Sequence, residues 1–206
     1  MAPTPTPTAP PPVPVPESST DAPPRLLRWT RGQYEQAIDA GVFGEDDRVE
    51  LITGHVVEMS PQNAAHATAV TLIDYALRTA LPSSSFARIQ LPLALSAESA
   101  PEPAVAIVEG TPADFAEAHP DTALLVVEVS SRSLAFDRSE KQGVYARAGI
   151  PTYWIANLVE GVLEVYTDPG GGRYRTVRTL EADATVAVPG TDATLPLVLC
   201  QVSIMG

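Results

Sequence analysis

The sequence predicts an α/β fold in which helices flank a mixed β-sheet. Two observations lead to this prediction: two helical patterns precede the main group of strand patterns, and a third helix interrupts that group. Strands and helices do not alternate regularly, which argues against a repeated β-α-β array. The 206 residues, 45% of them apolar, are enough for a single domain with a core of ordinary size.

The chain opens with a proline-rich segment, residues 1–24, in which Pro alternates with Ala, Thr and Val. Such a composition favours extended polyproline II and cannot bury a core. We therefore expect a disordered tail over 1–24 and one folded domain over 25–206. A partner-binding role is the alternative for the tail.

A short helix and a β-hairpin are the first elements expected. Thr30 and Gln33 have the spacing of a capping box, and Gly41 is suited to end the helix. Residues 49–52 and 55–59 are β-rich runs on either side of a Thr-Gly pair. This pattern predicts a hairpin.

A long helix and three strands are expected next. Apolar residues over 63–80 recur with the helical period. Strand patterns cover 86–95, 103–108 and 123–130, and the last contains Leu-Leu-Val-Val-Glu-Val. A nearly continuous apolar run suits a central strand that is covered on both faces.

The rest of the chain is expected to hold one helix and three more strands. A second capping-box-like pattern predicts a helix from Asp137 to Ala148, with Asp137 as its N-cap. Strand patterns then cover 153–156, 163–167 and 173–180, with Asp168-Pro169-Gly170 as a turn.

Composition argues against several classes of protein. The formal charge of −12 speaks against a general nucleic-acid coat but leaves room for a local basic groove. The lone cysteine, Cys200, cannot form an intrachain disulfide and is expected to be buried. The sequence shows no secretory signal and no run of about 18 apolar residues, so we expect a cytoplasmic protein without membrane contact.

Glu128 and Lys141 stand out on chemical grounds. A carboxylate inside an apolar strand costs several kcal/mol unless it is paired or coordinated. Lys141 is the only lysine among 13 basic residues, and an ammonium can be deprotonated in a perturbed site whereas a guanidinium cannot. One shared site explains both residues, and a structural ion pair is the alternative.

Two further acids can meet this pair at one end of the sheet: Glu50 on the hairpin and Glu102 before a strand. Clustered carboxylates bind Mg²⁺ or Mn²⁺. Such an ion lowers the pKa of a bound water, while a nearby lysine positions or deprotonates the nucleophile. For Glu50, the alternative to a role in the site is a solvent-facing position on the hairpin. For Glu102, the alternative is an exposed position in a Pro-rich turn.

Four stretches carry a resemblance to a known family: EDDRVELITGHVVEMSP, PEPAVAIV, LLVVEVSSRSLAFDRSEKQGVYARAGIPTYWI and LEVYTDPGGGRYR. From about residue 29 to the C-terminus, the chain resembles the bacterial Uma-two group of "putative restriction endonucleases", a branch of the PD-(D/E)xK nuclease superfamily. The resemblance implies a restriction-endonuclease-like mixed sheet. It also implies Mg²⁺- or Mn²⁺-dependent hydrolysis of DNA, which would bind in a local groove.

The resemblance implies roles for the residues that match family motifs. Glu50 matches a glutamate that supports the metal site, Glu128 matches the acidic member of the (D/E)xK pair, and Lys141 matches its lysine. Ser133 and Asp137 fill the family spacing ahead of that lysine.

Three positions are less decisive or depart from the family. His66 resembles a recurrent histidine, and we interpret it as a helix-start residue with a phosphate contact as the alternative. Asn157 stands where the family often has aspartate, and the sequence gives no consequence for this change. Ala104 stands where the family has the aspartate of Pro-Glu-Pro-Asp, a principal metal ligand.

Glu102 is the nearest carboxylate that can compensate for Ala104. Two residues of strand span about 6.6 Å, whereas a glutamate outreaches an aspartate by only about 1.5 Å. We therefore expect Glu102 to hold a displaced ion rather than the same one.

The sequence thus predicts a Mg²⁺-dependent DNA endonuclease that is impaired by Ala104. Glu50, Glu128 and Lys141 are its expected catalytic residues, and Glu128 and Glu102 are its expected metal ligands. The first alternative is a catalytically inactive nuclease-fold protein that binds DNA or protein. The second is an interaction module that uses the proline-rich tail. A homodimer is the default expectation for its assembly.

Overall fold

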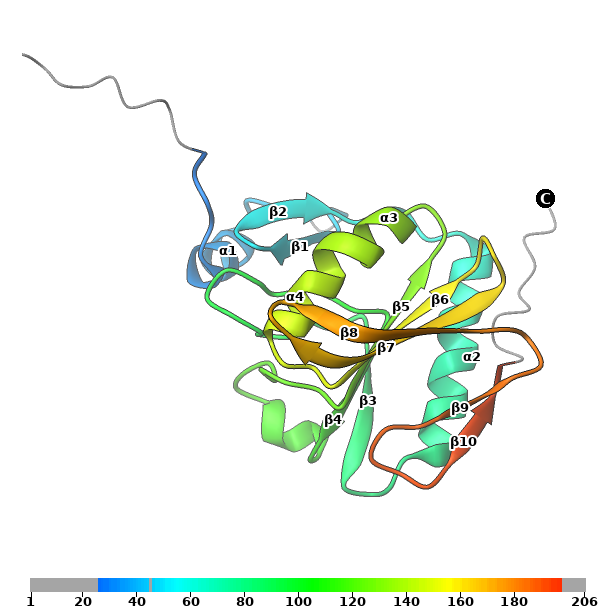
Figure 1. Cartoon of the computed structure of the whole chain (residues 1–206). Helices are drawn as coiled ribbons and strands as arrows, with labels where there is room; N and C mark the ends of the chain where they lie inside the picture. The colour runs from blue at the N-terminus through cyan, green and yellow to red at the C-terminus, as the bar shows by residue number, and fades with distance from the viewer. Residues whose placement is uncertain (1–25, 45, 198–206) are drawn as a thin grey trace, which may run out of the picture.

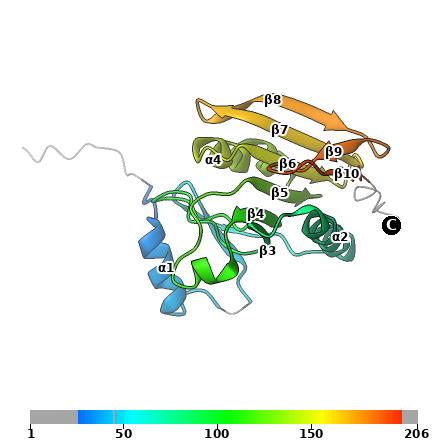
Figure 2. The same ribbon diagram turned by 90° about the horizontal axis from the view of Figure 1, so that it is seen from below.

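A six-stranded β-sheet forms the centre of the molecule in this computed structural model, which describes residues 26–44 and 46–197. The strands follow one another in the order β3-β4-β5-β6-β7-β8, as Figure 2 shows. They are β3 (Ser85–Ile89), β4 (Val105–Glu109), β5 (Leu125–Ser130), β6 (Thr152–Asn157), β7 (Val162–Gly170) and β8 (Arg173–Leu180).

One parallel pair makes the sheet mixed. β5 and β6 run parallel, whereas all the other neighbours pair antiparallel. A parallel pair needs a long crossover, and here it contains α3 (Leu134–Phe136), a π-helical turn (Asp137–Lys141) and α4 (Gln142–Arg147). The predicted mixed sheet with flanking helices is therefore confirmed.

Helices cover the two faces of the sheet (Figure 1). Helix α2 (Ala64–Ala80) packs on one face and α4 on the other. Side chains alternate along β5: Val127 and Val129 join the core cluster beneath α2, and Val126 joins the cluster beneath α4. The same alternation places Glu128 on the α4 face.

Shorter elements surround the sheet. Helix α1 (Arg31–Asp39) packs with the hairpin of β1 (Val49–Ile52) and β2 (His55–Glu58). The hairpin pairs with the segment that precedes β4. There the N–H of Ala100 donates to the carbonyl of Leu51 at 2.8 Å. The remaining elements are a 3₁₀ turn (Pro112–Phe115) and the antiparallel pair of β9 (Thr185–Ala187) and β10 (Thr194–Pro196).

The local expectations for the first elements are confirmed. Thr30 caps α1 and Gln33 completes the capping box, and Asn63 caps α2 by accepting from the N–H of His66. The hairpin turn places Thr53 and Gly54 at φ 48° and 79°. Positive φ at both central residues fits the twist of two-residue hairpins.

Two strand boundaries were predicted wrongly. The strand expected over 86–95 ends at Ile89, because Gln90 adopts a φ of 50° and turns the chain away from the sheet. The residues 168–170, expected as a turn, belong to β7, and Pro169 and Gly170 pair with Tyr174 and Arg173 of β8. The chain reverses at 171–172 instead, where both glycines have positive φ.

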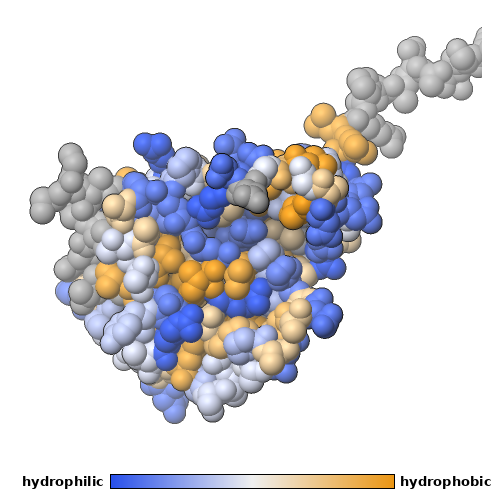
Figure 3. Space-filling model, turned by 180° about the vertical axis from the view of Figure 1, so that it is seen from behind, coloured by the Kyte–Doolittle hydropathy of each residue, from blue (hydrophilic) through white to orange (hydrophobic). Residues whose placement is uncertain are grey.

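The face seen from behind in Figure 3 is mostly hydrophilic, with a band of hydrophobic residues across its middle. Among the described residues, no helix combines the length and the apolar character that a membrane span requires. The expectations for the tail over 1–24 and for Cys200 fall outside the described residues.

Candidate functional site

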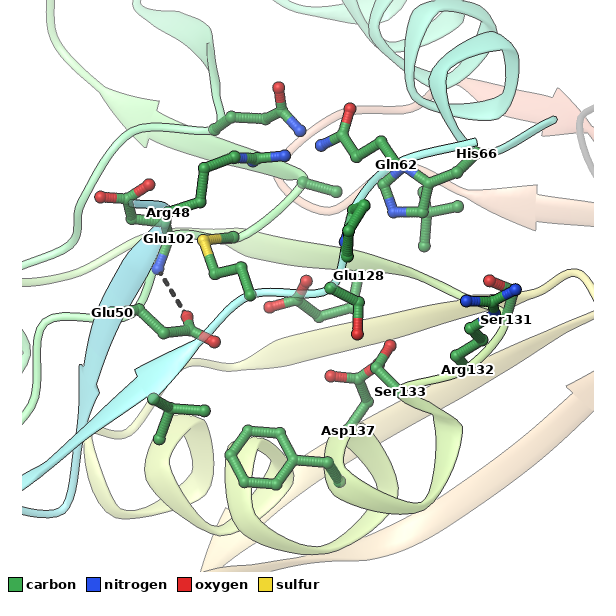
Figure 4. Close-up of a pocket in the computed structure, with 18 of the residues that line it drawn as sticks. Arg48, Glu50, Gln62, His66, Glu102, Glu128, Ser131, Arg132, Ser133 and Asp137 are labelled. Atoms are coloured by element: carbon green, nitrogen blue, oxygen red, sulfur yellow. Dashed lines mark hydrogen bonds between the residues drawn. The ribbon is translucent and has the colours of Figure 1, made fainter. Parts of the chain in front are cut away.

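A cavity of about 460 Å³ lies beside the carboxyl end of β5. Its walls come from the β1–β2 hairpin, the start of α2, β5 and the π-turn (Figure 4). The four residues that the sequence singled out, Glu50, Glu102, Glu128 and Lys141, all line it. Its volume lies within the range of small-molecule sites in proteins.

The buried ammonium of Lys141 joins two carboxylates. Its Nζ lies 3.0 Å from Oε1 of Glu50 and 3.0 Å from Oε1 of Glu128, and the three side chains are at most 8% exposed. The hydroxyl of Tyr145 donates to the same Oε1 of Glu128 at 2.7 Å. Charges so deeply buried are tolerated only with close partners of this kind.

Local structure explains how these groups meet. Glu128 points to the α4 face of β5, and α4 begins directly after Lys141. Tyr145 follows Lys141 by four residues, so both side chains lie on the same side of the helical segment. Glu50 arrives from β1, a part of the chain that is distant in sequence.

The pKa values follow from burial and charge. Burial raises the pKa of Glu128 to about 7, although Lys141 acts in the opposite direction. Burial alone would lower the pKa of Lys141, but Glu128 and Glu50 outweigh it and raise that pKa above its ordinary value. Burial and then Glu128 raise the pKa of Tyr145 well above 10. At neutral pH, Lys141 therefore carries its charge and Tyr145 keeps its proton.

The prediction that Asp137 is a helix N-cap is wrong. The helical segment begins at Leu134, and Asp137 lies inside the π-turn with only 2% exposure. Its Oδ2 accepts from the hydroxyls of Ser130 at 2.5 Å and Ser133 at 2.7 Å. Asp137 therefore ties the end of β5 to the turn that carries Lys141.

Glu102 and Ala104 lie on the loop that precedes β4. The N–H of Glu102 donates to Oε2 of Glu50 at 3.1 Å, so the two oxygens of Glu50 are engaged by Glu102 and Lys141. Burial and then Glu50 raise the pKa of Glu102. Ala104 lines the cavity with its methyl group and packs into the core beneath α2.

This donor set does not fit a complete divalent-metal site. Ala104 offers no ligand atom, and Lys141 occupies oxygens of both Glu50 and Glu128. Within the described ranges, no three His, Cys, Asp or Glu side chains are grouped so that they could hold a metal ion. The expected ligand roles of Glu128 and Glu102 stay predictions.

Sequence reasoning missed Tyr145 and Arg48. Tyr145 could have been found from its i+4 spacing to Lys141 on a predicted helix. Arg48 also lines the cavity, and its position two residues before Glu50 is the spacing of side chains that share one side of an extended strand.

Asn157, the second departure from the family pattern, has a structural role. Its Oδ1 accepts from the N–H groups of Val159 and Glu160, both at 3.0 Å, and its Nδ2 donates to Glu164 at 3.0 Å. It thereby closes the turn between β6 and β7. Asn157 does not line the cavity.

Two comparisons with known proteins agree with this architecture. Residues 31–197 match the model of the family Uma2, described as "Putative restriction endonuclease". A solved structure with a similar fold is that of a "putative nuclease belonging to DUF820" from Anabaena variabilis. The TM-score is 0.65 at 13% identity, covering 84% of this chain and 97% of that one. A comparison with curated proteins finds no match.

Proposed function

Because the chain belongs to the Uma2 family of "putative restriction endonucleases", we propose that it binds DNA at the cavity beside β5, and that its Mg²⁺-dependent phosphodiester hydrolysis is impaired by Ala104. The observation that carries this proposal is the buried Lys141 between Glu50 and Glu128. A lysine and two carboxylates beside a cavity can stabilise charge and transfer protons during hydrolysis of a phosphodiester. The alanine beside them removes one such group.

Lys141 and Glu128 have different roles in the proposed hydrolysis. Lys141 stays protonated, so it stabilises negative charge on a phosphodiester rather than removing a proton from water. Glu128, with a pKa of about 7, can accept a proton at neutral pH. A divalent cation, when bound, would lower the pKa of a water molecule and offset phosphate charge. The present donor set does not supply its full ligation.

The first test restores the carboxylate. We expect Ala104→Asp to bind Mn²⁺ in calorimetry and to nick supercoiled plasmid about tenfold faster than the parent or more, because it adds an oxygen ligand where the parent has a methyl group. Both proteins are assayed with Mg²⁺ and with Mn²⁺. The double variant Ala104→Asp/Lys141→Ala should lose the gained nicking.

Two outcomes of this test would contradict the proposal. If the parent already nicks as fast as Ala104→Asp, position 104 does not limit hydrolysis. If neither protein binds DNA nor cleaves it under either metal, the cavity is not a nucleic-acid site.

A second candidate function is binding of DNA without cleavage. The observation that favours it is Ala104, which lines the cavity with a methyl group that cannot bind a cation. In that case the parent binds DNA with equal affinity in EDTA and in Mg²⁺, and it shows no nicking. Affinity that depends on the metal would speak against this candidate.

A further inference from the structure

One wall of the cavity is rich in hydrogen-bond donors. This donor wall consists of Arg48, Gln62, His66 and Gln90. In Figure 4, Arg48, Gln62 and His66 lie on the opposite side of the view from Glu50 and Asp137. The cavity therefore has an acidic side that holds Lys141 and a donor side that holds Arg48.

Arg48 has no directly paired carboxylate at this wall, although its charge lowers the pKa of the nearby Glu102 against the effect of burial. Within the described residues, it forms no ion pair with a carboxylate. Its partner is a neutral amide: with the Gln62 amide turned to satisfy its neighbours, Gln62 Oε1 accepts from Arg48 Nη1 at 3.1 Å and Nη2 at 3.3 Å. Gln90 donates to the same oxygen. These amides fix the guanidinium without neutralising it.

His66 adds an unsatisfied group to the same wall. Its Nδ1 is buried and has no hydrogen-bond partner among the described residues. Buried polar atoms are nearly always paired, so this nitrogen is a polar group of the wall that the described residues leave unsatisfied. Burial lowers the pKa of His66, the nearby backbone of Val129 raises it, and Arg48 lowers it further.

We propose that the donor wall is a phosphate subsite, in which Arg48 and His66 hold a phosphate of the bound nucleic acid across the cavity from Lys141. This inference rests on the proposed function. A guanidinium offers paired N–H groups that match two phosphate oxygens, and its charge strengthens both hydrogen bonds. Glu50 lies across the cavity from this wall, whereas Glu102 lies beside Arg48, whose charge acts on it (Figure 4).

The first experiment measures binding of a fluorescein-labelled single-stranded 12-mer by anisotropy, in EDTA and at low salt. We expect Arg48→Gln to weaken binding by about 10- to 100-fold, because a charge-assisted hydrogen bond is lost. Arg48→Lys should lose less. The matched control is Arg175→Gln on β8, an exposed arginine that pairs with Asp168 outside the cavity and should bind like the parent.

The second experiment uses the histidine ring signals in NMR, since the chain has three histidines. Adding the 12-mer should shift the signals of His66 and leave those of His55 and His119 unchanged; His66→Gln assigns them. The pKa of His66 should rise on binding, because an added anion favours the imidazolium. The charged groups acting on this ring are Arg48, Asp137 and Lys141, and their variants are titrated alongside.

Inorganic phosphate is the second probe. It shows whether the subsite takes a phosphate group of a nucleic acid or free phosphate. If the 12-mer binds more tightly than phosphate and the His66 signals shift, both the subsite and the proposed function are supported. Equal affinity for the two keeps the subsite but contradicts a nucleic-acid ligand. If the parent binds the 12-mer while Arg48→Gln and His66→Gln bind equally well, the subsite is wrong and the proposed function stands. If the parent binds neither probe, both fail.

Discussion

At the scale of single residues, Glu128 shows how burial converts an ordinary carboxylate into a group that titrates near neutral pH. Desolvation raises its pKa, and Lys141 and Tyr145 offset only part of that effect. The result is one carboxylate that can exchange a proton at pH 7 beside a lysine that cannot. The acid and base roles of the site therefore follow from environment rather than from residue type.

This shift makes stability depend on pH in a defined direction. Glu128 has a folded-state pKa of about 7 against an ordinary value of 4.5, so between these values the folded protein binds a proton that the unfolded chain has released. The free energy of unfolding contributed by Glu128 therefore falls as the pH rises from 4.5 to 7. Glu128→Gln should remove this decline, measured by urea unfolding at pH 5 and pH 7.5.

Glu164→Gln is the matched control, because the pKa of Glu164 is shifted in the opposite direction from that of Glu128. Burial raises the pKa of Glu164, but the hydrogen bonds from Arg138, Tyr166 and Asn157 outweigh it and lower that pKa. Its contribution is present above pH 4.5 and is lost as the pH falls below it. If Glu128→Gln keeps the parent's decline between pH 5 and pH 7.5, the carboxylate of Glu128 is not the group that titrates there.

At the scale of elements, the π-turn between α3 and α4 decides where Lys141 points. The turn inserts an extra residue relative to an α-helix, which changes the direction of the side chains that follow it. Two side-chain contacts hold the turn. Asp137 accepts a hydrogen bond from Ser130 at the end of β5, and Arg138 forms an ion pair with Glu164 of β7. The turn is thus fixed to two strands of the sheet.

Arg138→Gln tests the contact with Glu164. Nε of Arg138 lies 3.1 Å from each oxygen of Glu164, and Nη2 lies 2.6 Å from Oε1. The variant should lower the free energy of unfolding by about 2 kcal/mol, because it leaves a buried carboxylate without its cation. It should also speed amide hydrogen exchange in the π-turn.

The control for this prediction breaks an exposed pair. Arg175→Gln removes the contact with Asp168, in which both side chains are more than half exposed, and should cost less than about 1 kcal/mol. Equal losses from Arg138→Gln and Arg175→Gln would show that the Arg138–Glu164 pair does not hold the turn.

At the scale of the whole molecule, the net charge of −12 limits how the protein can bind a polyanion. A surface with excess negative charge repels DNA except where arginines gather, so binding must rely on a few local contacts. The donor wall offers Arg48 as one such contact.

The salt dependence of binding should therefore be shallow. If one or two phosphates are neutralised, the logarithm of the binding constant for a single strand should fall with a slope of about −0.7 to −1.4 against the logarithm of salt concentration. Anisotropy between 20 and 200 mM KCl, roughly the range over which such slopes are measured, checks this. A slope near that of a many-contact DNA binder would mean that another surface binds the strand.

Local sequence patterns were enough to predict the first elements and two residues of the site, Glu128 and Lys141. Capping residues, turn residues and apolar periods depend on neighbours in the chain, so α1, the hairpin and α2 were predicted correctly. Glu128 and Lys141 were also visible, because a carboxylate in an apolar strand and the only lysine stand out in any reading.

Which groups meet in the site depends on long-range packing. The meeting of Lys141 with Glu50, the role of Asp137 and the place of Arg48 depend on packing between segments far apart in the chain. The π-turn was hidden for a similar reason, since one inserted residue leaves almost no trace in a helical period but redirects every later side chain. Local patterns fix periodicity, whereas side-chain partners follow from how the sheet, hairpin and crossover pack together.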